Sequence, residues 1–177
     1  MGLIRRREHG SDESARPDAA AAVWIRPFRS GDAPAVRELA SEVLSEFDLE
    51  LDPDGVDRDL DDIERAYRSA GGEFWVVESI DGGIVGSCGV WPDPEDPDRC
   101  ELRKMYLRPD LRGRGLGKRL LATAIDHARQ AGRRRMELET NRAMTGAIGL
   151  YRSRGFREVE GASACAVRCD RRFTREL

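Results

Sequence analysis

Apolar residues recur along the chain with two different periods, and these periods predict a mixture of strands and helices. Alternating runs rich in β-branched and aromatic residues are typical of strands, and the first such run, VWIRPF, begins at Val23. Between Asp32 and Phe47 the apolar residues recur at helical spacing, and Pro34 suits a first helical turn. We therefore expect ordered structure to begin near Val23 with a strand followed by a helix.

The same reasoning extends the pattern to the C-terminus. A second helix is predicted over VDRDLDDIERAYRSAGG, and a hairpin over EFWVVESIDGGIVGSCGVWP, whose Asp-Gly turn is typical of hairpins. The strands CELRKMYL and RRMELET enclose a long helix, and the short helix TGAIGLYRSRG precedes two closing strands, FREVE and CAVRCDRRFTREL. This order predicts one mixed sheet flanked by helices, an α/β fold without internal repeats. We expect Trp24 and Trp75 in its core, because both lie in apolar strands.

Composition narrows the classes of protein that remain. The 177 residues suit one domain, and 36% charged with 40% hydrophobic residues is typical of a globular protein. The net charge of −3 gives no overall attraction to nucleic acids or anionic membranes. The sequence has no run of about 18 apolar residues, so we expect no membrane span.

The N-terminal segment and the cysteines add two further expectations. Residues 1–22 have no apolar core of signal-peptide length and follow their basic cluster with acids and Ser, so we expect a disordered tail. The cysteines do not have the spacing of common zinc sites, which favours reduced thiols in a cytoplasm and no bound metal. They are Cys88, Cys100, Cys165 and Cys169.

Residues 111–120 read LRGRGLGKRL, a basic and glycine-rich turn directly before the apolar stripe of the long helix. A helix N-terminus exposes unpaired N–H groups and a partial positive charge, so it attracts phosphate, and glycine lets the backbone approach the anion closely. A P-loop would need Ser or Thr after Lys118, and a dinucleotide-binding turn would need a second residue before Gly117. Taken alone, the turn fits a phosphate site and a solvated helix entry equally well.

The turn and three other stretches together resemble the GNAT superfamily of acetyl-CoA-dependent N-acetyltransferases. Arg112, Gly115 and Gly117 match its Arg/Gln-x-x-Gly-x-Gly/Ala signature. The strand ELRKMYL with the following RP, the helix AIGLYRSRGF and the hairpin DGGIVGSCGV are similar to its fourth strand, tyrosine-bearing helix and second hairpin strand. The resemblance covers residues 23–177 and implies a GNAT domain, with a mixed central sheet of about seven strands flanked by about four helices.

The resemblance also implies a reaction and a coenzyme site. It implies transfer of an acetyl group from acetyl-CoA to a primary amine, directly within a ternary complex and without a metal. Main-chain groups of Met105, Tyr106 and Leu107 would pair with the pantetheine, and one N–H there would polarise the thioester carbonyl. The pyrophosphate would be held by main-chain N–H groups of Arg112, Gly113, Arg114, Gly115, Leu116, Gly117 and Lys118.

Three side chains correspond to positions with a chemical role in the family. Tyr151 matches the tyrosine that can protonate the leaving thiolate, and its ordinary pKa of about 10 leaves it protonated at neutral pH. Glu101 stands where some members have a general base, and the alternative is a surface carboxylate paired with an arginine. The family's asparagine before the tyrosine helix is replaced by Met144, so Asn141, just after the strand, is the candidate to contact coenzyme A.

The acceptor side is predicted from charge. Acidic residues crowd the segment between Glu42 and Glu64, which favours a cationic small-molecule amine or a basic peptide, or is simply a solvated acidic face. Phe47, Trp91 and residues 93–98 are candidate rim residues. We expect no nucleic acid or membrane partner and leave a homodimer open.

Two functions from other classes remain as alternatives. A GNAT-like domain could hold acyl-CoA as a sensor without turnover, although an intact Tyr151 argues against this. Nucleic-acid binding through Arg112, Arg114 and the arginine run 133–135 is disfavoured, because the net charge is acidic and no aromatic residues lie among these arginines.

Overall fold

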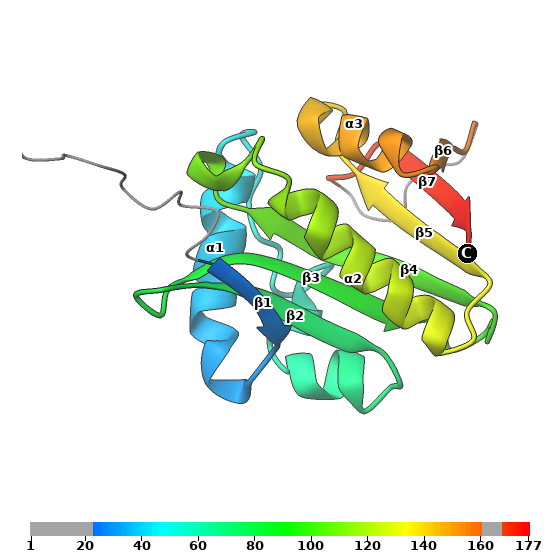
Figure 1. The fold of residues 1–177 in the computed structure, drawn as a ribbon, viewed down its shortest axis with the longest axis horizontal. Helices are drawn as coiled ribbons and strands as arrows, with labels where there is room; N and C mark the ends of the chain where they lie inside the picture. Colours follow the sequence, from blue (N-terminus) through cyan, green and yellow to red (C-terminus); the bar gives the residue numbers. More distant parts are fainter. Residues whose placement is uncertain (1–22, 161–167) are drawn as a thin grey trace, which may run out of the picture.

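Seven strands form one mixed sheet in the order β1-β2-β3-β4-β5-β7-β6 (Figure 1). The computed structural model describes residues 23–160 and 168–177. Neighbouring strands are antiparallel except β4 and β5, which are parallel. The strands are β1 (Val23–Pro27), β2 (Glu73–Ser79), β3 (Ile84–Pro92), β4 (Arg99–Leu107), β5 (Arg135–Thr140), β6 (Arg157–Glu158) and β7 (Arg171–Glu176).

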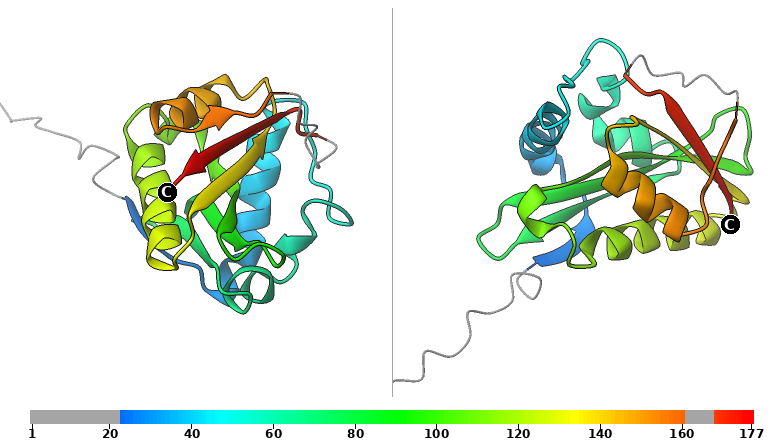
Figure 2. Two further views of the ribbon diagram at one scale, coloured as in Figure 1. Left: turned by 90° about the vertical axis from the view of Figure 1, so that its right-hand side faces the viewer. Right: turned by 90° about the horizontal axis from the view of Figure 1, so that it is seen from above.

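The helices lie on both faces of this sheet, and Figure 2 shows α1 and α2 on opposite sides of it. The helical elements are η2 (Ser30–Asp32), α1 (Ala33–Ser45), η3 (Arg58–Leu60), η4 (Glu64–Arg68), η5 (Pro109–Leu111), α2 (Leu116–Gln130) and α3 (Thr145–Ser153). The predicted α/β fold, one mixed sheet of about seven strands flanked by helices, is therefore confirmed.

Each long helix buries the apolar stripe that its sequence predicts. α1 turns Val36, Leu39, Ala40, Val43 and Leu44 toward the sheet. α2 does the same on the other face with Leu116, Leu120, Leu121, Ala124, Ile125 and Ala128. Each buried aliphatic side chain contributes about 1.5–3 kcal/mol relative to its exposed state, so these stripes fix both helices against the sheet.

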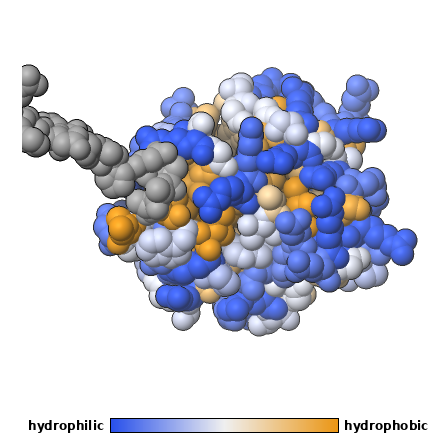
Figure 3. Space-filling view, viewed as in Figure 1, coloured by the Kyte–Doolittle hydropathy of each residue, from blue (hydrophilic) through white to orange (hydrophobic). Residues whose placement is uncertain are grey.

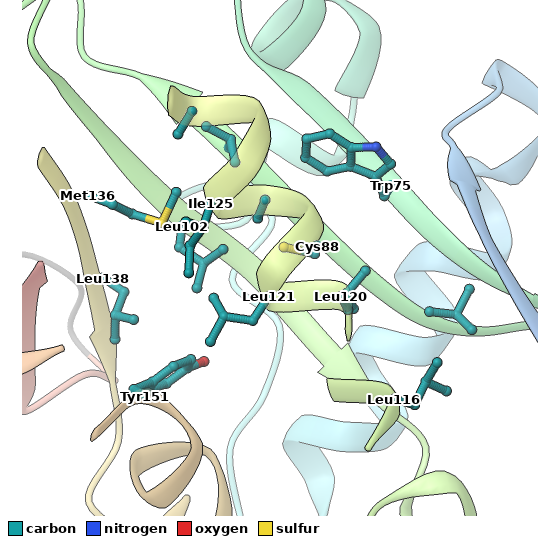
Figure 4. Close-up of a cluster of buried hydrophobic side chains, with 14 of the residues drawn as sticks. Trp75, Cys88, Leu102, Leu116, Leu120, Leu121, Ile125, Met136, Leu138 and Tyr151 are labelled. Carbon is teal, nitrogen blue, oxygen red and sulfur yellow. The ribbon is translucent and has the colours of Figure 1, made fainter. Parts of the chain in front are cut away.

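The two faces carry separate hydrophobic cores. The larger core lies under α2 and α3 and includes Trp75, Met136 and Tyr151 (Figure 4). The smaller core lies under α1, η3 and η4 and includes Tyr67 and Phe74. The face of the molecule seen in Figure 3 is mostly hydrophilic, with apolar side chains in small patches between hydrophilic ones.

The predicted second helix, residues 56–72, is wrong as a continuous α-helix. The segment forms the short 3₁₀ turn η3 and the π-helical turn η4. Aspartate is a poor helix former, and here its carboxylates take partners outside a regular helix. Asp57 accepts from the main-chain N–H of Asp52 at 2.9 Å, and Asp62 accepts from the N–H of Arg65 at 3.0 Å.

The prediction that Trp24 lies in the core is also wrong, because 44% of its surface is exposed. It lies on β1 at the edge of the sheet, where successive residues point to opposite faces, and Val23 takes the buried side. The Trp24 indole N–H donates to Glu78 Oε2 at 3.0 Å. Trp75 lies on β2, the strand next to β1, and is buried as expected.

The predicted tail, residues 1–22, lies outside the described residues. Cys165 and the first residues of the predicted last strand also lie outside them. Cys88 and Cys100 are buried free thiols, and burial raises the pKa of Cys100 to about 12. Both behave as structural thiols within the described chain.

Gly89 on β3 gives a test of the smaller core. A Cβ at this position would lie 2.4 Å from Tyr67 Cε1 and 2.8 Å from Phe74 Cδ2. We expect Gly89→Ala to lower the free energy of unfolding by about 1–3 kcal/mol, because the two rings must shift. Urea denaturation measures this, with Gly31→Ala as the control, since a Cβ at Gly31 meets nothing within 4 Å. Equal stability of the two variants would contradict the close packing of Tyr67 and Phe74 against Gly89.

Candidate active site

The site begins where β4 and β5 separate. Their parallel register joins Arg99–Glu101 only to Arg135–Glu137, and Figure 1 shows the strands diverging beyond these pairs. On its other edge β4 stays paired with β3, so β4 has one paired and one open edge from Leu102 onward. Main-chain N–H and C=O groups on such an edge are available to an extended ligand.

A bulge in β4 lies next to this separation. Gly89 pairs with Arg103 and Ser87 with Tyr106, so two β4 residues stand opposite Cys88. One of them, Lys104, has φ of 52°, a left-handed conformation that is strained for a residue with a side chain. The buried Ser87 hydroxyl donates to the Lys104 carbonyl at 2.7 Å and holds this turn of the strand.

A pocket of about 490 Å³ lies at the separation. Its walls come from β4, from β5, from α3 and from the segment before β7. The candidates predicted from the sequence that line it are Glu101, Met105, Tyr106, Asn141 and Tyr151. The geometry therefore brings together side chains that are up to 50 residues apart in the chain.

The glycine turn leads from the end of β4 into α2. Gly113 and Gly115 have φ of 77° and 81°, and a Cβ at either would meet nothing within 4 Å. Gly115 is the N-cap of α2, and the N–H of Arg119 donates to its carbonyl at 3.1 Å. The N–H groups of the first helical turn have no carbonyl one turn back, so this end of α2 suits an anion. A Cβ at Gly117 would lie 3.3 Å from Leu150 of α3, so the two helices approach closely here.

The side chain of Arg112 connects two elements of the fold. Its Nε donates to the carbonyl of Leu107 at 2.9 Å, and its two terminal nitrogens each lie 2.8 Å from a Glu46 carboxylate oxygen. Arg112 therefore joins the end of β4 to the end of α1. Arg114 and Lys118 are exposed beside the turn.

Tyr151 reaches from α3 toward Leu121 of α2 (Figure 4). Its ring packs near Phe156 and Phe173, with centroid distances of 5.9 Å and 6.4 Å. Burial raises the pKa of the Tyr151 hydroxyl well above its ordinary value, and neighbouring groups such as Cys88 add to this. The hydroxyl is therefore protonated at neutral pH, as a proton donor must be.

Glu101 is the last residue of β4 that pairs with β5. Its side chain is 28% exposed, and its Oε2 lies 2.6 Å from a terminal nitrogen of Arg103. The guanidinium of Arg103 lies over the ring of Trp91, 4.0 Å from the centroid, which fixes its direction. Glu101 is thus both a pocket residue and the partner of an arginine.

Asn141 has both ends of its amide occupied. Its Nδ2 donates to the carbonyl of Arg168 at 2.8 Å, and its Oδ1 accepts from the N–H of Ala143 at 2.9 Å. The residue therefore shapes the turn between β5 and α3 and joins it to the segment before β7.

The acidic segment 42–64 contributes only apolar side chains to the described pocket lining, namely Leu44, Leu49 and Val56. The acids that do line the pocket come from other elements, and they are Asp93, Glu95, Glu101, Glu137 and Glu139. Of the predicted rim residues, Trp91 and the first part of the loop 93–98 line the pocket, whereas Phe47 does not.

Sequence reasoning missed several charged pocket residues, among them Lys104, Glu139 and Arg168. The alternation of β4 could have shown that Lys104 falls on a buried position, as its neighbours Cys100 and Leu102 do. Nothing in the local sequence points to Arg168, because its partner Asp57 is 111 residues away.

The arginine run 133–135 is engaged with the loop before β4. Arg133 donates to the carbonyl of Pro97 at 2.7 Å, and Arg135 forms ion pairs with Asp96 and Glu137. These arginines therefore fasten the start of β5 to that loop. Among the described residues, no group of three or more His, Cys, Asp or Glu side chains could hold a metal ion. No helix in that part of the chain has the length and apolar character needed to cross a membrane.

Comparison with known proteins places this geometry in a family. The chain is 38% identical over 158 residues to the uncharacterized N-acetyltransferase YjgM of Escherichia coli, covering 86% of this chain and 94% of that protein. It is 33% identical over 122 residues to the uncharacterized N-acetyltransferase C1271.07c of Schizosaccharomyces pombe, with 69% and 74% covered.

Solved structures agree in fold. A GNAT-family acetyltransferase from Staphylococcus aureus superposes with a TM-score of 0.81 at 25% identity, covering 88% of this chain and 99% of that one. A putative acetyltransferase from Salmonella typhimurium, solved with its cofactor acetyl-CoA, has a TM-score of 0.69 at 22% identity, with 88% and 94% covered. Residues 35–156 match the Acetyltransferase (GNAT) family, and the chain therefore belongs to this family of acyltransferases.

Proposed function

We propose that the protein transfers the acetyl group of acetyl-CoA directly to a primary amine within a ternary complex. The observation that carries the proposal is the pocket between β4 and β5, which is lined by Tyr151 and Glu101. β4 leads from this pocket to the glycine turn at the start of α2. A thioester held between the turn and the pocket would present its acetyl group to both side chains.

The residues present fit coenzyme A. The open space beside Gly113 and Gly115 and the N-terminus of α2 suit a pyrophosphate, with Arg114 and Lys118 nearby in sequence. The open edge of β4 at Met105, Tyr106 and Leu107 suits the amide groups of pantetheine. One main-chain N–H of this stretch would polarise the carbonyl oxygen as the amine attacks.

The two side chains divide the proton transfers. Glu101 would accept a proton from the acceptor ammonium, because an amine with a pKa near 10 is mostly protonated at pH 7. The neutral amine nitrogen would then form a bond to the acetyl carbon, the carbon–sulfur bond would break, and Tyr151 would give its proton to the thiolate. The second proton leaving the nitrogen would restore the tyrosine hydroxyl. The buried, protonated hydroxyl of Tyr151 supports its role.

A cationic amine or basic peptide is the acceptor class that we propose. Support comes from the acids on the pocket wall rather than from the segment 42–64. The described lining also carries five cations. The two most buried of them, Lys104 and Arg168, are balanced from behind by Asp57 and Asp59, whereas Arg99, Arg103 and Arg172 pair with acids of the wall itself, so the wall acids outnumber the cations that remain. Location in the cytoplasm and self-association stay predictions.

Acetyl-CoA binding gives the first test. At a hundred times its dissociation constant, acetyl-CoA should raise the free energy of unfolding by about 2.7 kcal/mol, measured as a higher melting temperature. Gly115→Ala should abolish this rise, because a Cβ fills the space proposed for the anion. Gly132→Ala is the matched control, because Gly132 has a similar φ of 77° and open space but lies at the far end of α2. Both variants should lose roughly 1–2 kcal/mol from backbone strain. Equal acetyl-CoA binding by both would contradict the turn as its site.

Tyr151→Phe tests the proton donor. It keeps the ring that packs near Phe156 and removes only the hydroxyl. Release of free thiol with an amine acceptor should slow by roughly a hundred- to ten-thousand-fold in kcat, with acetyl-CoA affinity unchanged. An unchanged kcat with an acceptor for which chemistry limits the rate would assign Tyr151 to packing alone.

Glu101→Gln tests the proton acceptor through pH. The variant should lower kcat/KM at neutral pH, and the loss should shrink as the pH approaches the amine pKa of about 10, where the acceptor arrives neutral. Arg103→Gln serves as the control, because it removes the arginine partner and leaves the carboxylate. Parallel pH–rate profiles for wild type and Glu101→Gln would remove Glu101 from the chemistry.

A further inference from the structure

Four charged side chains form a largely buried cluster at the pocket, which we name the Asp57 cluster: Asp57, Asp59, Lys104 and Arg168. Lys104 Nζ lies 2.7 Å from Asp57 Oδ1 and 3.1 Å from Asp59 Oδ1. Arg168 contacts both oxygens of Asp57, one of them at 2.7 Å. The side chains of Asp57 and Lys104 are only 2% and 5% exposed.

The cluster joins three parts of the chain that are distant in sequence. Lys104 belongs to the bulge of β4, Asp57 to the segment between α1 and η3, and Arg168 to the segment before β7. Figure 2 shows the segment between α1 and η3 close to the start of β7. Val56, Lys104 and Arg168 all line the pocket. The cluster therefore ties one wall of the pocket to the others.

Further hydrogen bonds fasten the same three parts. Lys104 Nζ donates to the carbonyl of Val56 at 2.7 Å, and Arg168 donates to the carbonyl of Glu50 at 3.3 Å. Burial alone would raise the pKa of the Asp57 carboxyl, but hydrogen bonds from Arg168, the Asp52 N–H and Lys104 lower it to about 2. Asp57 is therefore an anion that all three parts share.

The cluster also acts on the strained backbone of β4. Lys104 has φ of 52°, and such a residue keeps this conformation only where its surroundings impose it. Here Ser87 holds its carbonyl and the two aspartates hold its ammonium group. The residues after it, Met105 and Tyr106, form the open edge of β4 in the pocket.

Stability alone does not account for such a cluster, because a buried ion pair is often replaced by apolar residues without loss. What the ion pairs and hydrogen bonds of this cluster supply is one fixed geometry. We propose that Asp57 and Lys104 are positioning residues, which set the direction of the β4 main chain at the acetyl group and hold the acceptor side of the pocket against it. The inference rests on the proposed acetyl transfer.

The variants are Asp57→Asn and Lys104→Met, singly and together. Each replacement keeps the length of the side chain and removes one charge. Asp32→Asn is the matched control, because Asp32 and Arg26 form another largely buried ion pair, with both side chains 11% exposed, on η2 and β1 away from the pocket. Loss of that pair should lower the melting temperature and leave kcat unchanged.

We expect each cluster variant to lower kcat by roughly a hundredfold, because a small misplacement of reacting groups has effects of that size. KM for the acceptor should rise, whereas calorimetry should give an acetyl-CoA affinity within a fewfold of wild type, since the glycine turn lies outside the cluster. The double variant should be about as slow as the slower single variant, because the two residues act as one unit.

Hydrogen exchange gives a readout that does not depend on turnover. Amides of residues 102–107 should exchange faster in the cluster variants than in wild type or Asp32→Asn at matched stability. If Asp57→Asn and Lys104→Met do not fold, Ser87→Ala replaces them in this experiment, because it removes only the hydrogen bond to the Lys104 carbonyl. It should show the same faster exchange and a smaller loss in kcat.

The outcomes separate the two proposals. A wild-type protein that binds acetyl-CoA but acetylates no amine would overturn the proposed function. Hydrogen exchange of residues 102–107 would then be the test of whether the Asp57 cluster positions β4. A wild-type protein that turns over, with cluster variants and Ser87→Ala that keep both kcat and slow exchange, would overturn the positioning role. A loss of kcat matched by Asp32→Asn would show that stability alone is responsible and would also overturn it.

Discussion

The short parallel contact between β4 and β5 is the constraint on which the rest of the site depends. It lasts for three residue pairs and ends at Glu101 and Glu137. Beyond that point β4 remains held by β3 on one edge and is open on the other. An edge inside a sheet is costly to leave unpaired, so the polar main chain there needs a partner. An extended ligand with amide groups fits that need without relying on any one side chain.

The chain protects this open edge by fixing both of its ends. At the N-terminal end, ion pairs of Glu137 with Arg99, Arg135 and Arg172 hold the last paired residues together. At the C-terminal end, Arg112 joins the carbonyl of Leu107 to Glu46, which directly follows α1. Between these ends, Lys104 in the bulge is held by Ser87 at its carbonyl and by Asp57 at its ammonium group. The edge stays apart from β5 because each point along β4 has another partner.

Local pattern was enough to predict most of the fold. The stripes of α1 and α2, the hairpin of β2 and β3 and the order of elements follow from period, turn residues and caps, which act over a few residues. The glycine turn could also be placed, because positive φ at Gly113 and Gly115 is a local demand. Of the site, Tyr151, Glu101 and the β4 residues could be named only because several short motifs resemble one family.

The failures share one physical cause, which is pairing over long distances in sequence. Trp24 reads as a core residue, yet its exposure depends on β1 being the edge strand. The predicted second helix fails because its aspartates find partners elsewhere, including Lys104, 47 residues on from Asp57. Sequence spacing carries no information about such contacts.

The acidic segment shows how far this matters for function. As a run of like charges it suggests a surface that attracts a cation. In the folded chain three of its acids have partners in distant parts of the fold: Glu46 holds Arg112, Asp57 holds Lys104 and Arg168, and Asp59 accepts from the Tyr67 hydroxyl at 2.5 Å. These carboxylates shape the pocket from behind its surface. A charge that is already neutralised by an internal partner attracts a substrate weakly, so these carboxylates act on the site by holding the pocket wall in place.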